Sequence, residues 1–372
     1  MKPPRVSVVM TAYNREQYVE EAIRSVLGQT FPDFELIVVD DGSTDGTAAI
    51  VGRLAAEDPR IRVITQSNQG IVRAANVGCA AARGEYLARF DSDDVCFPDR
   101  LARQVDFLDH HSSFAVVAGI AQVIDERGHP GGFLDYHADR SSLRGLMEQG
   151  CWIIQPAALM RRDAFEAAGG YRQGFAPAED YDLWLRIADD HDLANLPDPP
   201  VIRYRVHATQ ASDRHKRQQA IGGLAARTAT RMRRSTGRDP LDGVIELSPD
   251  VLARLGLGER DIEAAVVEVD LIRIGQGIRC DSAAGLEARE AALARMAAAH
   301  PWRWYGAQVD RMRRDVEIEI AVRRARLLLA AGDPLRAAGV VATAACRAQM
   351  IVPRLFAGML RKAGLLPSYH RR

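Results

Sequence analysis

The chain has 372 residues, of which 47% are hydrophobic and 26% are charged. This length and composition predict a globular protein of about two domains, each large enough for its own core. Lys plus Arg and Asp plus Glu both total 49, so the overall charge gives no indication of a nucleic-acid partner. No apolar run reaches the ~18 residues that a membrane span requires.

The N-terminus and the cysteines indicate a cytoplasmic protein. The chain passes directly from Met1 into a strand-like run at 6–11, which does not resemble a signal peptide. The five cysteines form no C-x-x-C pair, and their odd number and wide spacing favour reduced thiols over a disulfide or zinc framework.

The first half of the chain alternates strands and helices. After the strand at 6–11, Asn14 stands at an N-cap position with Gln17 three residues on, a capping-box pattern, and a helix is expected to follow it as far as Gly28. Further strands are predicted at 34–39, 61–65 and 86–90, with helices at 44–58 and 70–82 between them. This order predicts an α/β fold with a doubly wound, mostly parallel sheet.

Polar residues follow three of these strands. Because ligands gather at the carboxyl ends of parallel strands, we expect Thr11, Asp41 and Asp91 to lie together. Asp91-Ser92-Asp93-Asp94 places three carboxylates after a buried strand, where they repel one another and lose hydration. A Mg²⁺ or Mn²⁺ ion would remove that conflict, whereas the alternative is a solvated turn that caps the next helix. The sequence has neither a G-x-G-x-x-G nor a P-loop motif after the first strand, which disfavours a dinucleotide enzyme and a P-loop NTPase.

The second half is rich in Ala, Arg and Leu at helical spacing. We therefore expect two domains, one over residues 1–214 and a helical one over 215–372. Residues 323–338 resemble one helix-turn-helix unit of the tetratricopeptide kind. The expected helices lie at 220–234, 249–255, 259–275, 282–299, 309–331 and 334–350.

The C-terminal tail is basic and amphipathic, because seven Lys or Arg residues and no acidic residue follow Asp333. The tail would either bind the anionic inner face of the cytoplasmic membrane or pack on its own helical bundle with a solvated basic face.

Several spaced motifs resemble those of family 2 glycosyltransferases, the inverting, metal-dependent group with the GT-A fold. The resemblance covers about residues 5–212, with Ala12 where many members have Pro. A Q-x-x-R-W motif is absent, so the resemblance implies a non-processive enzyme that adds single sugars. The motifs are 6–14 (VSVVMTAYN), 40–45 (DDGSTD), 68–70 (NQG), 76–78 (NVG), 91–94 (DSDD) and 178–186 (AEDYDLWLR).

The resemblance implies a nucleotide-sugar donor, most simply a UDP-sugar, and an acceptor hydroxyl on a saccharide or lipid-linked saccharide of the bacterial envelope. Asp41 would accept a hydrogen bond from the uracil imide N–H, and Asp40 would be structural. Arg73 would reach the donor phosphates or form an exposed salt bridge. The expected donor-binding residues are Thr11, Tyr13, Asn14, Asp41, Asn68, Gly70, Arg73, Asp91 and Ser92.

By the same resemblance, Asp93 is the expected direct metal ligand, with Asp91, Asp94 and His207 as further ligands. His207, in Tyr204-Arg205-Val206-His207, could instead be a surface residue, and Arg205 has a weaker claim to the site.

Asp180 is the expected general base, and Glu179 would fix its orientation. Both acids could instead serve only the first turn of a helix. Trp152 and Gln155 would line the acceptor site or simply pack.

Two rivals remain at this point. A sugar-nucleotide pyrophosphorylase would need a glycine-rich basic first loop, which Thr11-Ala12-Tyr13-Asn14 does not supply. A non-catalytic sugar-nucleotide-binding scaffold, whose helical half recruits partners, is disfavoured by the presence of Asp93 and Asp180.

Overall fold

The computed structural model describes residues 2–136, 143–207, 215–276, 283–299, 306–333, 335–337 and 339–340. The chain divides into two compact units, Met1–Gly258 and Glu259–Arg372, so the first unit continues past the expected boundary at 214. The long helix α9 (Lys216–Thr236) explains the difference, because it packs on α7 (Glu179–Ile187) of the same unit. A Cβ at Gly222 of α9 would lie 2.8 Å from the Cβ of Ala178, so the glycine permits this close approach.

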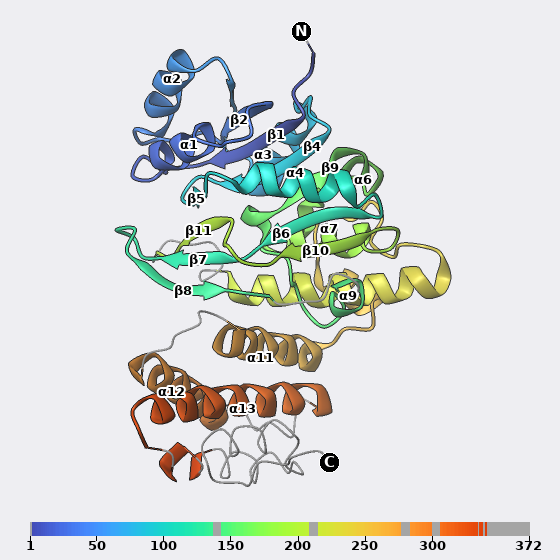
Figure 1. Cartoon of the computed structure of the whole chain (residues 1–372). Coiled ribbons are helices and arrows are strands. Elements are labelled where there is room, and N and C mark those ends of the chain that lie inside the picture. The colour runs from blue at the N-terminus through green and yellow to red at the C-terminus, as the bar shows by residue number, and fades with distance from the viewer. Residues whose placement is uncertain are drawn as a thin grey trace, which may run out of the picture. The chain divides into compact units, whose positions relative to one another are not determined.

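A seven-stranded sheet runs through the first unit in the order β10-β6-β9-β4-β1-β2-β3 (Figure 1). Neighbouring strands are parallel except at β9, which is antiparallel to both β4 and β6. The expected doubly wound, mostly parallel sheet is therefore confirmed. Its strands are β1 (Val6–Ala12), β2 (Phe34–Asp40), β3 (Ile61–Thr65), β4 (Tyr86–Asp91), β6 (Phe114–Gly119), β9 (Leu159–Arg161) and β10 (Asp192–Leu196).

Helices cover the sheet and bury its apolar runs. All seven residues of β2 are buried, which explains the uninterrupted run of Leu, Ile and Val at 36–39. Gly78 on α3 brings that helix close to β1 and β2, since a Cβ there would lie 2.4 Å from a methyl group of Val9. The helices are α1 (Val19–Leu27), α2 (Thr47–Glu57), α3 (Ile71–Ala80), α4 (Arg100–His110), α5 (Leu143–Leu146), α6 (Arg162–Ala167), α7, α9 and α10 (Pro249–Arg254).

A second sheet, in the order β5-β11-β7-β8, lies beside the acidic cluster in sequence and in space. Strand β5 (Val95–Cys96) begins directly after Asp94 and pairs antiparallel with β11 (Ile202–Arg205). Strand β11 ends at Arg205, two residues before His207. Strands β7 (Ala121–Ile124) and β8 (Pro130–Leu134) complete this sheet.

The expected capping box of the first helix is wrong. Helix α1 begins at Val19 after Tyr18, which makes no side-chain capping hydrogen bond. Asn14 instead adopts a positive φ of 51°, a conformation that asparagine tolerates better than most residues. Its side-chain Oδ1 accepts a hydrogen bond from the backbone N–H of Thr44 at 2.8 Å, so Asn14 holds the loop that follows β2.

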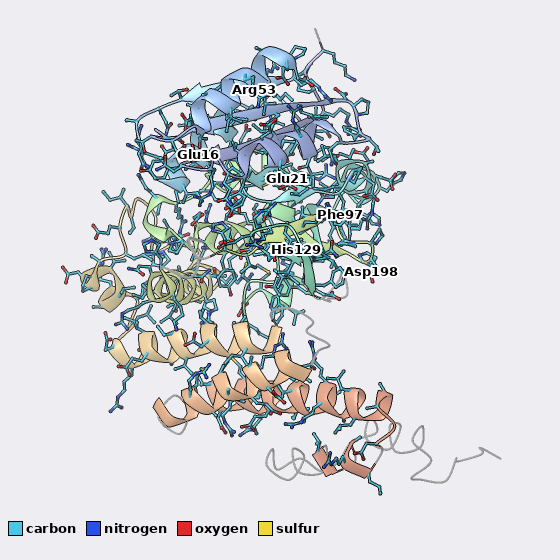
Figure 2. All side chains as sticks on the ribbon, turned by 90° about the vertical axis from the view of Figure 1, so that its left-hand side faces the viewer. Glu16, Glu21, Arg53, Phe97, His129 and Asp198 are labelled. Carbon is cyan, nitrogen blue, oxygen red and sulfur yellow. The ribbon has the colours of Figure 1, made fainter. Side chains whose placement is uncertain are left out.

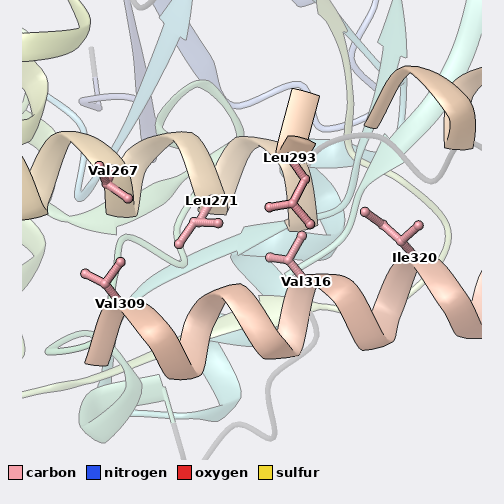
Figure 3. Close-up of a cluster of buried hydrophobic side chains, with 6 residues drawn as sticks. All are labelled: Val267, Leu271, Leu293, Val309, Val316 and Ile320. Atoms are coloured by element: carbon pink, nitrogen blue, oxygen red, sulfur yellow. The ribbon is translucent and has the colours of Figure 1, made fainter. Parts of the chain in front are cut away.

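The second unit is helical, as expected, with α11 (Glu259–Gln276), α12 (Ala283–Ala299) and α13 (Gly306–Ala330). Apolar residues of all three helices form one cluster (Figure 3), made of Val267, Leu271, Leu293, Val309, Val316 and Ile320. Helix α13 ends before Gly332, whose φ is 79°. Most of the predicted helix at 334–350 and the rest of the basic tail lie outside the described residues. No helix of the described ranges is both long and apolar enough to cross a bilayer.

Candidate active site

The carboxyl ends of β1, β2 and β4 bring the predicted site residues to one edge of the sheet. In the parallel register Thr11 lies opposite Asp91 on one side, and Ala12 lies opposite Asp40 on the other. The backbone N–H of Asp41 donates to the carbonyl of Ala12 at 2.9 Å, which ties the turn after β2 to the end of β1. The structure therefore brings Thr11, Asp41 and Asp91 to the same edge.

Asp91, Asp93 and Asp94 form an acidic cluster after β4, with one carboxylate oxygen of each within 4.8 Å of the others. Asp94 is 1% exposed, and its Oδ1 accepts a hydrogen bond from the backbone N–H of Arg205 at 2.8 Å. Its Oδ2 is buried without a partner in the described part of the chain. Burial, together with the charges of Asp93 and Asp91, raises the pKa of Asp94 well above its usual range. An all-oxygen donor set with one buried orphan oxygen fits a hard divalent cation.

Two nitrogen-bearing side chains contact Asp93. The Oδ2 atom of Asp93 lies 3.0 Å from Nε2 of His207 and 3.2 Å from Nε of Arg15. Burial opposes ionisation of Asp93, but the hydrogen bond from His207 and the charge of Arg15 outweigh it and lower the pKa of Asp93. His207 is 4% exposed, so it is not a surface residue and lies at the acidic cluster as predicted.

The imidazole of His207 is held by a stack of rings. Tyr18 stacks on His207 with centroids 5.4 Å apart and an interplanar angle of 28°, and the guanidinium of Arg205 lies 4.9 Å over the Tyr18 ring. Arg205 also donates from Nε to the backbone oxygen of Asp93 at 2.8 Å and from Nη2 to Glu21 at 2.6 Å. Arg205, which had only a weak claim from the sequence, therefore joins the acidic turn to α1.

Asp41 organises the loop after β3. Its Oδ1 accepts from Nε2 of Gln66 at 2.7 Å and from the N–H of Gln69 at 2.9 Å, while its Oδ2 accepts from the N–H of Gly70 at 2.9 Å. Asp41 is 3% exposed. Asp40 accepts from the backbone N–H of Ser43 at 3.2 Å.

The other expected donor-binding residues line the same edge. Tyr13 is 45% exposed, and Asn68 and Gly70 are also exposed, directly before the N-terminus of α3. Arg73 is exposed and donates to Oε1 of Gln69 at 2.7 Å. Ser92 is buried in the acidic turn.

The first turn of α7 carries Glu179 and Asp180. Glu179 is 5% exposed, its Oε2 has no partner among the described residues, and burial followed by the charge of Asp180 raises its pKa to about 8. Asp180 is partly exposed, its Oδ1 accepts from the N–H of Tyr181 at 2.7 Å, and burial raises its pKa to about 6. The charge of Asp91 also raises the pKa of both side chains, so the start of α7 lies within electrostatic range of the acidic cluster.

Arg89 was not anticipated from the sequence. It lies within β4, is 1% exposed, and donates from Nη2 to Oγ1 of Thr11 at 2.8 Å. Its Nη1 lies 3.4 Å from Oδ1 of Asp91, and its charge lowers the pKa of Glu179 and Asp180. The signal was present, because Arg89 is the one charged residue in the apolar run of β4 before Asp91.

The segment around Trp152 borders Asp180. The ring of Trp152 meets the ring of Tyr136 edge-on, 6.0 Å between centroids, and its Nε1 donates to the carbonyl of Leu146 at 2.7 Å. Burial and then the charge of Asp180 raise the pKa of the Cys151 thiol. Gln155 begins the short 3₁₀ helix Gln155–Ala157 and is partly exposed.

Comparisons with known proteins agree with this geometry. The model of the family described as "Glycosyl transferase family 2" matches residues 7–169. EpsE of Bacillus subtilis (strain 168), which is named as a glycosyltransferase, is 37% identical over 191 residues, or 50% of this chain and 68% of EpsE. The chondroitin synthase of Escherichia coli is 32% identical over 188 residues, which cover 50% of this chain and 27% of that protein.

A solved structure shares the fold. The mannosyltransferase PcManGT from Pyrobaculum calidifontis, in complex with GDP-Man and Mn²⁺, superposes with a TM-score of 0.50 at 21% identity over 87% of each chain. The expected GT-A architecture is confirmed.

Proposed function

The chain belongs to glycosyltransferase family 2, and we propose that it is an inverting, metal-dependent enzyme that transfers one sugar from a nucleotide sugar to an acceptor hydroxyl. The proposed donor is a UDP-sugar. The proposed acceptor is a saccharide or lipid-linked saccharide of the bacterial envelope, and the relative named as a chondroitin synthase supports a saccharide acceptor.

The proposal rests on the partly exposed carboxylate of Asp180 at the start of α7, which lies close enough to the acidic cluster after β4 for the charge of Asp91 to raise its pKa. An inverting displacement needs a base on one side of the sugar and a stabilised leaving group on the other. The pKa of Asp180, about 6, suits a base that is ionised near neutral pH. Glu179, with its pKa near 8, remains neutral there and places no second negative charge beside the base.

The donor would lie along the edge formed by β1, β2 and β4. The carboxylate of Asp41 accepts three hydrogen bonds from the loop after β3. One acceptor position on Oδ2 is left for the imide N–H of the uracil. Asp93, with Asp91, Asp94 and His207, would hold the divalent cation. That ion would act as a Lewis acid on the donor diphosphate.

The transfer itself then needs one proton movement by the protein. Asp180 accepts the proton of the acceptor hydroxyl while that oxygen forms the new bond to C1 of the sugar. The bond from C1 to the phosphate oxygen breaks, and the nucleoside diphosphate leaves with the electron pair. Trp152 and Gln155 are proposed to contact the acceptor, because their segment borders Asp180.

The test is nucleoside diphosphate release from a panel of UDP- and GDP-sugars with Mn²⁺. We expect Asp180→Asn to lower kcat by about 10²- to 10⁴-fold while UDP binding is retained. Asp190→Asn is the matched control, because Asp190 is exposed just beyond α7. Equal turnover by wild type and Asp180→Asn would remove Asp180 from this role. A wild type that binds UDP-sugars without turning them over would favour the scaffold function.

A further inference from the structure

Arg15 contacts the carboxylate that is expected to bind the metal ion directly. Its Nε is 3.2 Å from Oδ2 of Asp93, the same oxygen that contacts His207. Asp93 is the expected direct metal ligand, so an arginine partly neutralises the carboxylate to which a cation would bind.

Arg15 and His207, the two side chains on Oδ2 of Asp93, differ in their freedom to move. The His207 side chain is 2% exposed and is stacked on Tyr18. The Arg15 side chain is 25% exposed, and it lines an open pocket of about 270 Å³ next to the acidic cluster. Besides Asp93, its guanidinium contacts the backbone oxygens of Tyr13 and Asn14. The histidine is therefore fixed, whereas the arginine has space beside it.

The main chain of Arg15 is held in place. Its backbone N–H donates to Oγ1 of Thr47 at 2.7 Å, which ties the loop after β1 to the start of α2. A movement of Arg15 is therefore a movement of the side chain alone.

A divalent ion on Asp93 would repel the guanidinium, because two positive charges cannot share one carboxylate oxygen at contact distance without strong repulsion. A phosphate oxygen on the same ion would lie about 3–4 Å from the ligating oxygen of Asp93, since each metal–oxygen bond is about 2.1 Å long. That position is within reach of a side chain that now touches Asp93. A guanidinium binds phosphate through parallel hydrogen bonds, so it has a second anionic partner nearby.

We propose that Arg15 is an internal counter-ion, which competes with the metal for Asp93 in the free protein and moves to the donor diphosphate when the metal binds. The inference rests on the metal-dependent function proposed above. It predicts that metal and nucleoside diphosphate bind cooperatively. The metal displaces Arg15 from Asp93 toward the diphosphate, and a bound diphosphate draws Arg15 away from Asp93 and so frees this carboxylate for the metal.

The test uses Arg15→Gln with two separate titrations in a calorimeter. Mn²⁺ alone is expected to bind several-fold more tightly to this variant than to wild type, about the effect of losing a partly exposed ion pair. UDP at saturating Mn²⁺ is expected to bind about tenfold more weakly, because a charge-assisted hydrogen bond is lost. These opposite signs separate the proposal from general damage, which would weaken both.

Arg53→Gln is the matched control. Arg53 lies on α2 (Figure 2), its side chain is 48% exposed, and it pairs with Glu20 and Glu57 away from the acidic cluster. The same loss of charge there should change neither titration. Arg15→Lys keeps the charge and should not bind Mn²⁺ more tightly than wild type.

Unchanged or weaker Mn²⁺ binding by Arg15→Gln would overturn the competition with the metal, and unchanged UDP binding would overturn the transfer to the diphosphate. If Arg15→Gln does not fold, Arg15→Met, which keeps most of the alkyl stem, serves for the same titrations. Neither titration measures turnover. If the wild type transfers sugar but Arg15→Gln shows neither change in affinity, this inference alone is refuted. If Arg15→Gln shows both changes but the wild type transfers no sugar, the proposed activity alone is refuted.

Discussion

Glu179 should make the folded protein less stable as the pH rises. Its carboxyl is 5% exposed, and burial, then the charge of Asp180, raises its pKa from 4.5 to about 8. Between these pH values the folded protein keeps a proton that the unfolded chain has already released, so the free energy of unfolding falls with increasing pH. Each pH unit costs about 1.4 kcal/mol for one such group. From about pH 5.5 to about pH 7.5 the cost is therefore about 3 kcal/mol.

Glu179→Gln removes this dependence, because an amide is neutral at every pH. We expect the stability of the variant relative to wild type to increase by about 3 kcal/mol over the same interval. The free-energy cost of burying the amide is the same at both pH values, so it cancels when the relative stability at one pH is subtracted from that at the other. The measurement is guanidinium denaturation followed by circular dichroism, without metal or nucleotide.

Glu166→Gln is the control, since Glu166 on α6 undergoes the same chemical change with a side chain that is 61% exposed. Its stability relative to wild type should stay constant between the two pH values. If Glu179→Gln behaves like this control, Glu179 is ionised in the folded protein near neutral pH. The argument that a neutral Glu179 stands beside the base Asp180 would then fail.

Three further predictions follow from the packing and charges around the site. Tyr18→Ala should weaken Mn²⁺ binding, measured by calorimetry, about 10- to 100-fold, because it removes the ring that orients the imidazole of His207. Tyr18→Phe keeps the ring and should bind Mn²⁺ as tightly as wild type. Arg89→Met removes a buried positive charge that lowers the pKa of Asp180, so the acidic limb of the pH profile of kcat/KM should move to higher pH. An unchanged profile would show that Arg89 does not control the ionisation of Asp180. Gly78→Ala should destabilise the protein by about 1–3 kcal/mol in thermal denaturation through overpacking. Gly52→Ala, on α2 with nothing within 4 Å, should instead stabilise it by about 1 kcal/mol, and equal effects of the two would refute the packing argument.

The sequence predicted the first four strands to within one residue at each end. Their mainly apolar runs are bounded by polar residues, and a strand buried on both faces is rich in apolar residues, as β2 is at 36–39. The acidic cluster was also predictable, because Asp91, Asp93 and Asp94 are close in the chain and follow a strand whose end is fixed by the same pattern.

Local patterns failed where tertiary contacts compete with them. Asn14 and Gln17 match a capping box, but Asn14 uses its side chain on the loop after β2, so the helix starts later. The change of composition near residue 215 marks the end of the strands, yet α9 packs on α7 and remains in the first unit. Neither packing partner is visible in the local sequence.

The sequence by itself determined the alternation of strands and helices, and with it the edge at which Thr11, Asp41 and Asp91 meet. It could not show which side chains contact the carboxylates. The contact of Asp93 with Arg15 spans 78 residues and that with His207 spans 114, and the buried charge of Arg89 reaches α7 only through the folded sheet. Side-chain charge acts through space over a few ångströms, so only the tertiary structure decides which distant residues share one site.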